Sequence, residues 1–246
     1  MVDYLLTLIP IFFFIALIYS AAGFGGGSSY LAVLALFPLE FTEIRVVALL
    51  CNIVVVSGSV YVFFKSDFLK VRKVLPLVLW SVPLAYFGGS LKINQQIFFV
   101  ILGLTLFTSS VLMLVKKQDE KIRLPKYFNG FIGGSIGFLS GLVGIGGGIF
   151  LSPLLYLSRW NTPKIIAATT ASFILVNSIA GLVGQIHTNG FSVDVQATIL
   201  LLITVLVGGQ VGSRITASRI NPVVIRKITA FLILFVSLRI LWRAFF

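Results

Sequence analysis

Two glycine runs are the residues of this chain best suited to binding chemistry. They are Gly23-Phe24-Gly25-Gly26-Gly27-Ser28-Ser29 and Gly144-Ile145-Gly146-Gly147-Gly148, and both interrupt long apolar segments. Each glycine costs a helix roughly 1 kcal/mol relative to alanine, so the runs predict that the helix stops. A helix that restarts after such a break leaves backbone N–H groups free in its first turn. These groups carry partial positive charge, and a small anion can approach them closely because glycine has no side chain.

An asparagine follows each glycine run and can complete such an anion site. Asn52 and Asn177 each lie in the apolar segment after a run, and an amide supplies two N–H donors. We expect the second helical pieces to begin near Ser28 and Ile149. If the two halves are inverted repeats, the two breaks come together near the midplane of the membrane. The predicted substrate-binding residues are Gly25, Gly26, Gly27, Ser28, Asn52, Gly146, Gly147, Gly148, Thr170 and Asn177.

Helix packing is the alternative role for several of these residues. Glycines spaced by four let membrane helices approach closely, and packing is the expected role of Gly130, Gly134, Gly137 and Gly141. Bridging between helices is the alternative role for the two asparagines. A dinucleotide-binding loop is excluded in practice, because the chain lacks a βαβ unit and the last glycine of that fingerprint.

The composition places most of the chain in lipid. Of 246 residues, 58% are hydrophobic and 11% are charged, whereas soluble domains carry about 25% charged residues. The sequence therefore predicts an all-α polytopic membrane protein. Its net charge of +12 fits basic cytoplasmic loops and gives no reason to expect nucleic acid. No carboxylate falls at the centre of a span, so we expect neither a resident metal nor a cofactor. Nothing in the pattern indicates an oligomeric state.

The apolar segments fall into two sets with the same order. In each set a helix ends at a glycine run, a short apolar piece follows, and three longer segments come next. Three features match between the sets: the glycine runs, Asn52 with Asn177, and Gly88-Gly89 with Gly208-Gly209. This order predicts an internal duplication, with residues 1–115 as the first transmembrane repeat, 116–126 as a cytoplasmic linker and 127–246 as the second repeat. The predicted spans are 46–64, 74–91, 97–115, 165–186, 195–212 and 223–242.

The distribution of basic residues distinguishes two topologies. If each break is a kink within one crossing, the two sides carry 11 and 8 Lys or Arg residues. If each break is the tip of a hairpin, the sides carry 15 and 4. The positive-inside rule favours the hairpins, which makes the two repeats inverted relative to each other. Residues 65–73 and 116–126 are then cytoplasmic, and residues 187–194 and both termini are outside. Glu40, Glu43 and Arg45 are expected to mark the outer surface.

The motifs resemble those of the sulfite exporter TauE/SafE family of bacterial and archaeal membrane proteins. The resemblance rests on Gly-Phe-Gly-Gly-Gly-Ser in the first half and Gly-Leu-Val-Gly-Ile-Gly-Gly-Gly-Ile-Phe-Leu-Ser-Pro-Leu-Leu in the second. It also rests on Ala167-Ala168-Thr169-Thr170-Ala171-Ser172-Phe173. It covers nearly the whole chain, and it implies transport of small sulfur-containing anions such as sulfite, sulfoacetate or another organosulfonate.

The expected function is therefore secondary transport of such an anion by alternating access, in the cell membrane of a bacterium or archaeon. The two halves differ before the asparagines, where Thr-Thr-Ala-Ser-Phe precedes Asn177 and Arg45-Val-Val-Ala-Leu precedes Asn52. A paired site is therefore not symmetric in its hydroxyl donors. A non-transporting membrane partner or assembly subunit is an alternative function. An intramembrane enzyme is the third, and it fits poorly because the chain has a single histidine and a single cysteine.

Overall fold

The chain folds into a bundle of helices. The computed structural model describes residues 1–21, 25–115, 128–158 and 160–215, with isolated positions between 227 and 242. After a short 3₁₀ turn at Val2–Tyr4, the first half contains α1 (Leu5–Ala21), α2 (Gly27–Leu34), α3 (Phe41–Lys65), α4 (Val71–Ser90) and α5 (Gln95–Val115). The second half contains α6 (Phe128–Val143), α7 (Gly148–Leu157), α8 (Pro163–Asn189) and α9 (Val195–Ile215). No strand occurs in these ranges. The predicted linker at 116–126 lies outside the described residues, as does half of the predicted span at 223–242.

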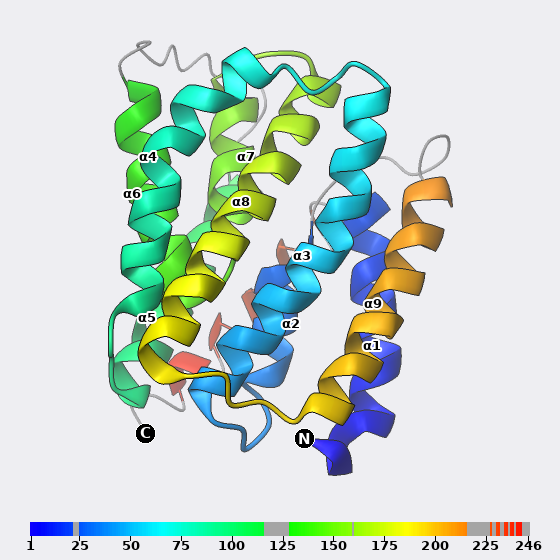
Figure 1. The fold of residues 1–246 in the computed structure, drawn as a ribbon, viewed down its shortest axis with the longest axis vertical. Coiled ribbons are helices and arrows are strands. Elements are labelled where there is room, and N and C mark those ends of the chain that lie inside the picture. The colour runs from blue at the N-terminus through cyan, green and yellow to red at the C-terminus, as the bar shows by residue number, and fades with distance from the viewer. Residues whose placement is uncertain are drawn as a thin grey trace.

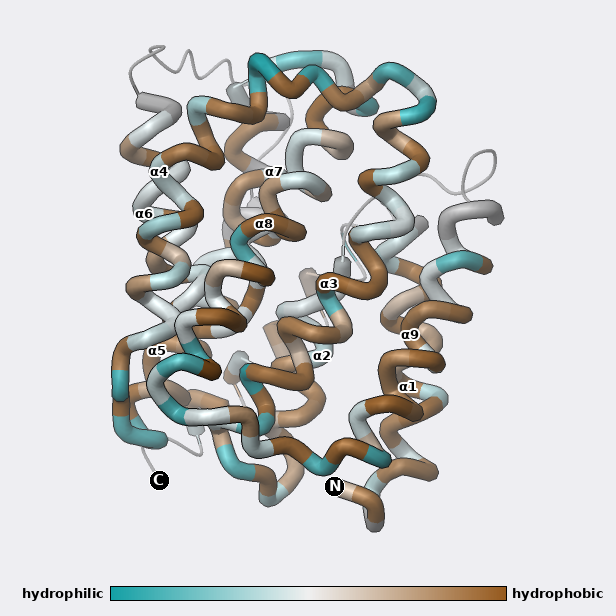
Figure 2. Tube along the Cα trace, viewed as in Figure 1, coloured by the Kyte–Doolittle hydropathy of each residue, from teal (hydrophilic) through white to brown (hydrophobic). Residues whose placement is uncertain are grey.

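The helices have the length and composition of a multi-pass membrane protein. Four of those described are long and apolar enough to cross a bilayer, over Phe41–Lys65, Val71–Ser90, Lys164–Asn189 and Val195–Gly212. Hydrophilic residues gather in the loops at the two ends of the bundle, and the helices between them are mainly apolar (Figure 2). The expected all-α membrane fold is confirmed at this level.

Both glycine runs interrupt the helices as the sequence predicts. The second pieces, α2 and α7, begin at Gly27 and Gly148, each one residue before the predicted start. Both pieces are short. Helix α2 ends at Leu34 instead of continuing to residue 39, and α7 ends at Leu157. In the view of Figure 1, α2 lies in the lower part of the bundle and α7 in the upper part.

Corresponding helices of the two halves make corresponding packing contacts. The long helices α3 and α8 pack against each other across the two halves. Helix α4 packs on α6 and α8 of the other half, and the corresponding helix α9 packs on α1 and α3. The matched glycine pairs follow this pattern. Gly88 and Gly89 lie against Phe138 of α6 and Gly181 of α8, whereas Gly208 and Gly209 lie against Phe13 of α1 and Val55 of α3.

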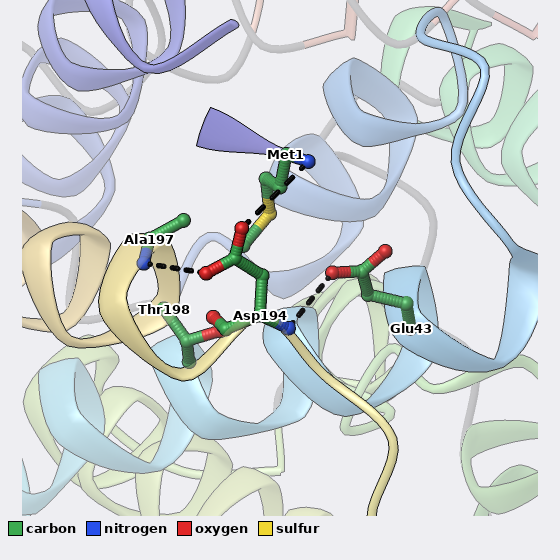
Figure 3. Close-up of polar contacts among 5 residues, drawn as sticks. All are labelled: Met1, Glu43, Asp194, Ala197 and Thr198. Atoms are coloured by element: carbon green, nitrogen blue, oxygen red, sulfur yellow. Dashed lines mark hydrogen bonds and ion pairs between the residues drawn. The ribbon is translucent and has the colours of Figure 1, made fainter. Parts of the chain in front are cut away.

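Polar contacts show which loops share an end of the bundle. At one end the backbone N–H of Asp194 donates to Glu43 Oε1 at 3.2 Å, and the terminal amine of Met1 lies 3.9 Å from Asp194 Oδ2. Asp194 also accepts from Ala197 N and from Thr198 Oγ1 at the start of α9 (Figure 3). At the other end Lys164 Nζ lies 5.0 Å from the ring centroid of Phe68, and Lys73 Nζ lies 5.9 Å from the ring of Trp160.

The glycines of α6 pack this helix against α4, as expected. A Cβ atom at Gly137 or Gly141 would collide with the backbone of Ser81 or Ala85. A Cβ atom at Gly130 or Gly134 would meet only the side chains of Trp80 or Leu84 at less than 3.0 Å. Gly137 and Gly141 therefore set the distance between the two helix backbones.

Candidate anion-binding site

The first break is shaped by a glycine in the left-handed region. Gly26 has a φ of 81° and precedes the first residue of α2, and its carbonyl oxygen accepts from Ser29 N and Tyr30 N. An L-amino acid side chain is disfavoured at this angle by about 1–2 kcal/mol. The whole stretch from residue 25 to 35 is buried. Ser28 lies in this buried first turn, and the neighbouring Ser29 Oγ is 2.6 Å from Tyr19 Oη.

The second break contains three glycines in the left-handed region. Gly144, Gly146 and Gly147 have φ values of 87°, 81° and 81°. The amides of Gly144 and Ile145 both donate to Ser140 O and end α6, and Gly147 O accepts from Phe150 N and Leu151 N where α7 begins. Residues 140–148 are buried, so this break lies inside the protein like the first.

Asn52 joins the two breaks. Its Oδ1 accepts from Gly27 N at 3.1 Å, and its Nδ2 donates to Ile145 O at 3.0 Å and to Ser178 Oγ at 3.2 Å. The side chain is buried, and Cβ atoms at Gly25, Gly27 or Gly146 would collide with it. The bridging role considered for Asn52 is therefore confirmed. It satisfies an N–H at the start of α2 with its own amide oxygen 3.1 Å away.

Asn177 is placed differently from Asn52. Its Nδ2 donates to Phe173 O of its own helix at 2.8 Å, and its buried Oδ1 has no partner. It makes no hydrogen bond to a described residue of either break. Thr170 lies against the second break, since a Cβ at Gly148 would be 3.4 Å from its Cγ2, and its hydroxyl also has no partner. A direct anion contact by Asn177 or Thr170 stays a prediction.

The breaks are closed in this conformation. A Cβ at Gly147 would lie 2.9 Å from Phe173 Cε1, and one at Gly148 would collide with Ile174. An anion at the breaks therefore requires Asn52 or these side chains to move. Two apolar grooves lie on the outside of α4, and neither is lined by a residue of the breaks. The described residues contain no group of three His, Cys, Asp or Glu side chains that could hold a metal ion.

Arg45 corrects one expectation from the sequence. It was expected at the outer surface, but its side chain is fully buried in the first turns of α3. Its Nη2 donates to Gly89 O at 3.2 Å and to Gly141 O at 3.0 Å, and its stem packs against Gly144, where a Cβ would lie 3.3 Å from Arg45 Cβ. Both acceptors are backbone carbonyls of distant helices. They leave no mark in the side-chain pattern, so sequence reasoning missed this contact.

Comparison with known proteins gives a consistent family assignment. The family described as sulfite exporter TauE/SafE matches residues 8–240. A probable membrane transporter protein from Sinorhizobium fredii is 32% identical over 238 residues, covering 94% of this chain and 96% of that protein. A probable membrane transporter protein from Methanocaldococcus jannaschii is 29% identical over 156 residues, covering 58% of this chain and 57% of that protein. No solved structure matches the chain.

Proposed function

Because the chain belongs to the sulfite exporter TauE/SafE family, and is therefore a membrane transporter, we propose that it is a secondary transporter of a small sulfur-containing anion. The substrate class is sulfite, sulfoacetate or another organosulfonate. The proposed location is the cell membrane of a bacterium or archaeon, and the proposed mechanism is alternating access without a chemical reaction.

The observation that carries this proposal is the Asn52 bridge between two broken helices. A broken helix in a membrane presents the positive end of its second piece to an anion, a pattern used by secondary transporters. Here Asn52 Oδ1 occupies the N–H of Gly27, the first residue of α2. When Asn52 turns away, this N–H becomes free and the amide Nδ2 can donate to the same anion. The bridge is thus a closed form of the proposed site.

The packing supports two inverted repeats. Exchanging the halves preserves the contacts among α1, α3, α4, α6, α8 and α9. Phe68 and Lys164 share one end, and Glu43 and Asp194 share the other. These pairs are the ones that hairpin breaks bring together, whereas a single kinked crossing at each break would separate them. We propose that one repeat rocks against the other around Asn52, exposing the site to each side in turn.

The proposal is tested by anion uptake into proteoliposomes. The purified protein is expected to take up labelled sulfite or one of a panel of sulfonates, with saturation. Asn52→Asp places a carboxylate against Ile145 O and against the incoming anion, so uptake should fall at least about tenfold. Gln196→Glu makes the same charge change at an exposed position of α9 and should leave uptake unchanged.

Two outcomes would contradict parts of the proposal. Absence of saturable uptake across the panel by the correctly folded wild-type protein would remove anion transport. Equal uptake by wild type and Asn52→Asp would keep transport but remove the two breaks from the route.

A further inference from the structure

Arg45 has more hydrogen-bond donors than acceptors. A guanidinium carries five N–H donors and keeps its charge in proteins. In Arg45 the two donors of Nη2 are used by Gly89 O and Gly141 O, and Nε and Nη1 have no partner although both are buried. No carboxylate of the described residues forms an ion pair with it. Three buried donors of a cation are therefore left without an acceptor, which is costly in a protein interior.

The two helix ends that hold Arg45 orient it and offset part of its charge. Gly89 lies in the last turn of α4 and Gly141 in the last turn of α6, where unpaired carbonyl groups carry partial negative charge. These contacts account for Nη2 and for the fixed position of the guanidinium. They leave Nε and Nη1 available, so the cation is held in place by one nitrogen and can bind a ligand with the others.

A second unpaired polar side chain lies at the same level on the facing helix. Helices α3 and α8 pack against each other and run in opposite directions (Figure 1), and the bond from Asn52 to Ser178 fixes their register. Arg45 lies seven residues before Asn52 and Gln185 seven residues after Ser178. Both are therefore displaced from the bridge by roughly 10 Å toward the same end. Gln185 is fully buried, and neither its Oε1 nor its Nε2 has a partner.

We propose that Arg45 and Gln185 form a second anion site, which binds an oxyanion between the Asn52 bridge and the end of the bundle that holds Glu43 and Asp194. Arg45 supplies the charge and the N–H donors of Nε and Nη1. Gln185 supplies the amide N–H donors, and its Oε1 accepts from an oxyanion that carries a proton, such as hydrogen sulfite. This inference deepens the proposed function and rests on it for the identity of the anion. It places a charged residue on one side of the breaks. On the other side the corresponding residue, seven positions before Asn177, is the uncharged Thr170.

The variant Gln185→Glu tests this site while leaving Arg45 in place. The new carboxylate should accept from the free donors of Arg45 and take the place of the anion. We expect the melting temperature of the purified variant without added anion to equal or exceed that of the wild type. The rise in melting temperature on adding sulfite or sulfate should occur in the wild type and disappear in the variant. The KM for sulfite uptake should rise at least about tenfold.

The controls separate this site from a structural role of Arg45 and from the proposed function. Gln196→Glu should keep the wild-type response to sulfite. A Gln185→Glu protein with an unchanged sulfite response and an unchanged KM would overturn the second site, even if transport is intact. An anion-dependent rise in melting temperature that Gln185→Glu abolishes would uphold the site, even if no uptake is found and the proposed transport fails. A rise with chloride as large as that with sulfite would overturn the oxyanion assignment.

Discussion

At the scale of single residues, the two asparagines differ in what their removal would expose. Asn52→Ala leaves Gly27 N and Ile145 O buried without the partner that Asn52 provides. An unsatisfied buried polar group costs about 1–3 kcal/mol. We therefore expect Asn52→Ala to lower the melting temperature in detergent clearly.

Asn177→Ala is the matched comparison. It removes a bond to Phe173 O in the same helix and also removes a buried Oδ1 that has no partner. The change in stability should be below about 1 kcal/mol. Equal losses of melting temperature in the two variants would contradict the special position of Asn52.

The sequence predicted some of these residue roles and not others. The glycine runs were identified because several glycines close together break a helix, and the two asparagines because each follows a run in an otherwise apolar segment. Arg45 and Gln185 were missed for different reasons. Arg45 stands next to the acidic residues at the start of its helix, which suggested a surface. Gln185 is a single polar residue near the end of α8, and only the register with α3 brings it to the level of Arg45.

At the scale of helices, the contact of α6 with α4 depends on which glycine is replaced. Gly141→Ala places a Cβ against the backbone of Ala85, and overpacking typically costs about 1–3 kcal/mol. Gly134→Ala meets only the end of the Leu84 side chain, which can move, and it gains up to about 1 kcal/mol of helix propensity. Melting temperatures in detergent should fall for the first variant and stay level or rise for the second. The reverse order would contradict the packing.

The ends of the helices show how well the first and last residues of a helix can be predicted from the sequence. The starts of α2 and α7 were predicted to within one residue because glycine runs define them. The end of α2 was not, since the apolar pattern continues to residue 39 and the chain nevertheless leaves the helix after Leu34. Two turns follow it, in which Leu36 N donates to Val33 O and Phe37 N donates to Leu34 O. Hydrophobicity alone does not distinguish such turns from another helical turn.

At the scale of the whole molecule, the charge distribution and the contacts at the two ends predict opposite sides for two exposed serines. Ser66 follows α3, and Ser192 precedes α9. In a background where Cys51 is replaced by alanine, a cysteine at 192 should react with an impermeant maleimide in intact cells. A cysteine at 66 should react only after the membrane is permeabilised. Reaction of both from the same side would contradict the inverted arrangement.

The buried Asn52 bridge also bears on how tightly the membrane stays sealed. A path that conducts small anions continuously would short-circuit the membrane potential on which a cell depends. Here all three hydrogen bonds of Asn52 must break before its side chain can turn away from the two helix breaks, at about 0.5–1.5 kcal/mol for each bond. Since 1.36 kcal/mol corresponds to a tenfold change in rate, the bridge slows each opening by roughly one to three orders of magnitude. The proposed carrier thus gives up turnover speed and gains a barrier against leakage.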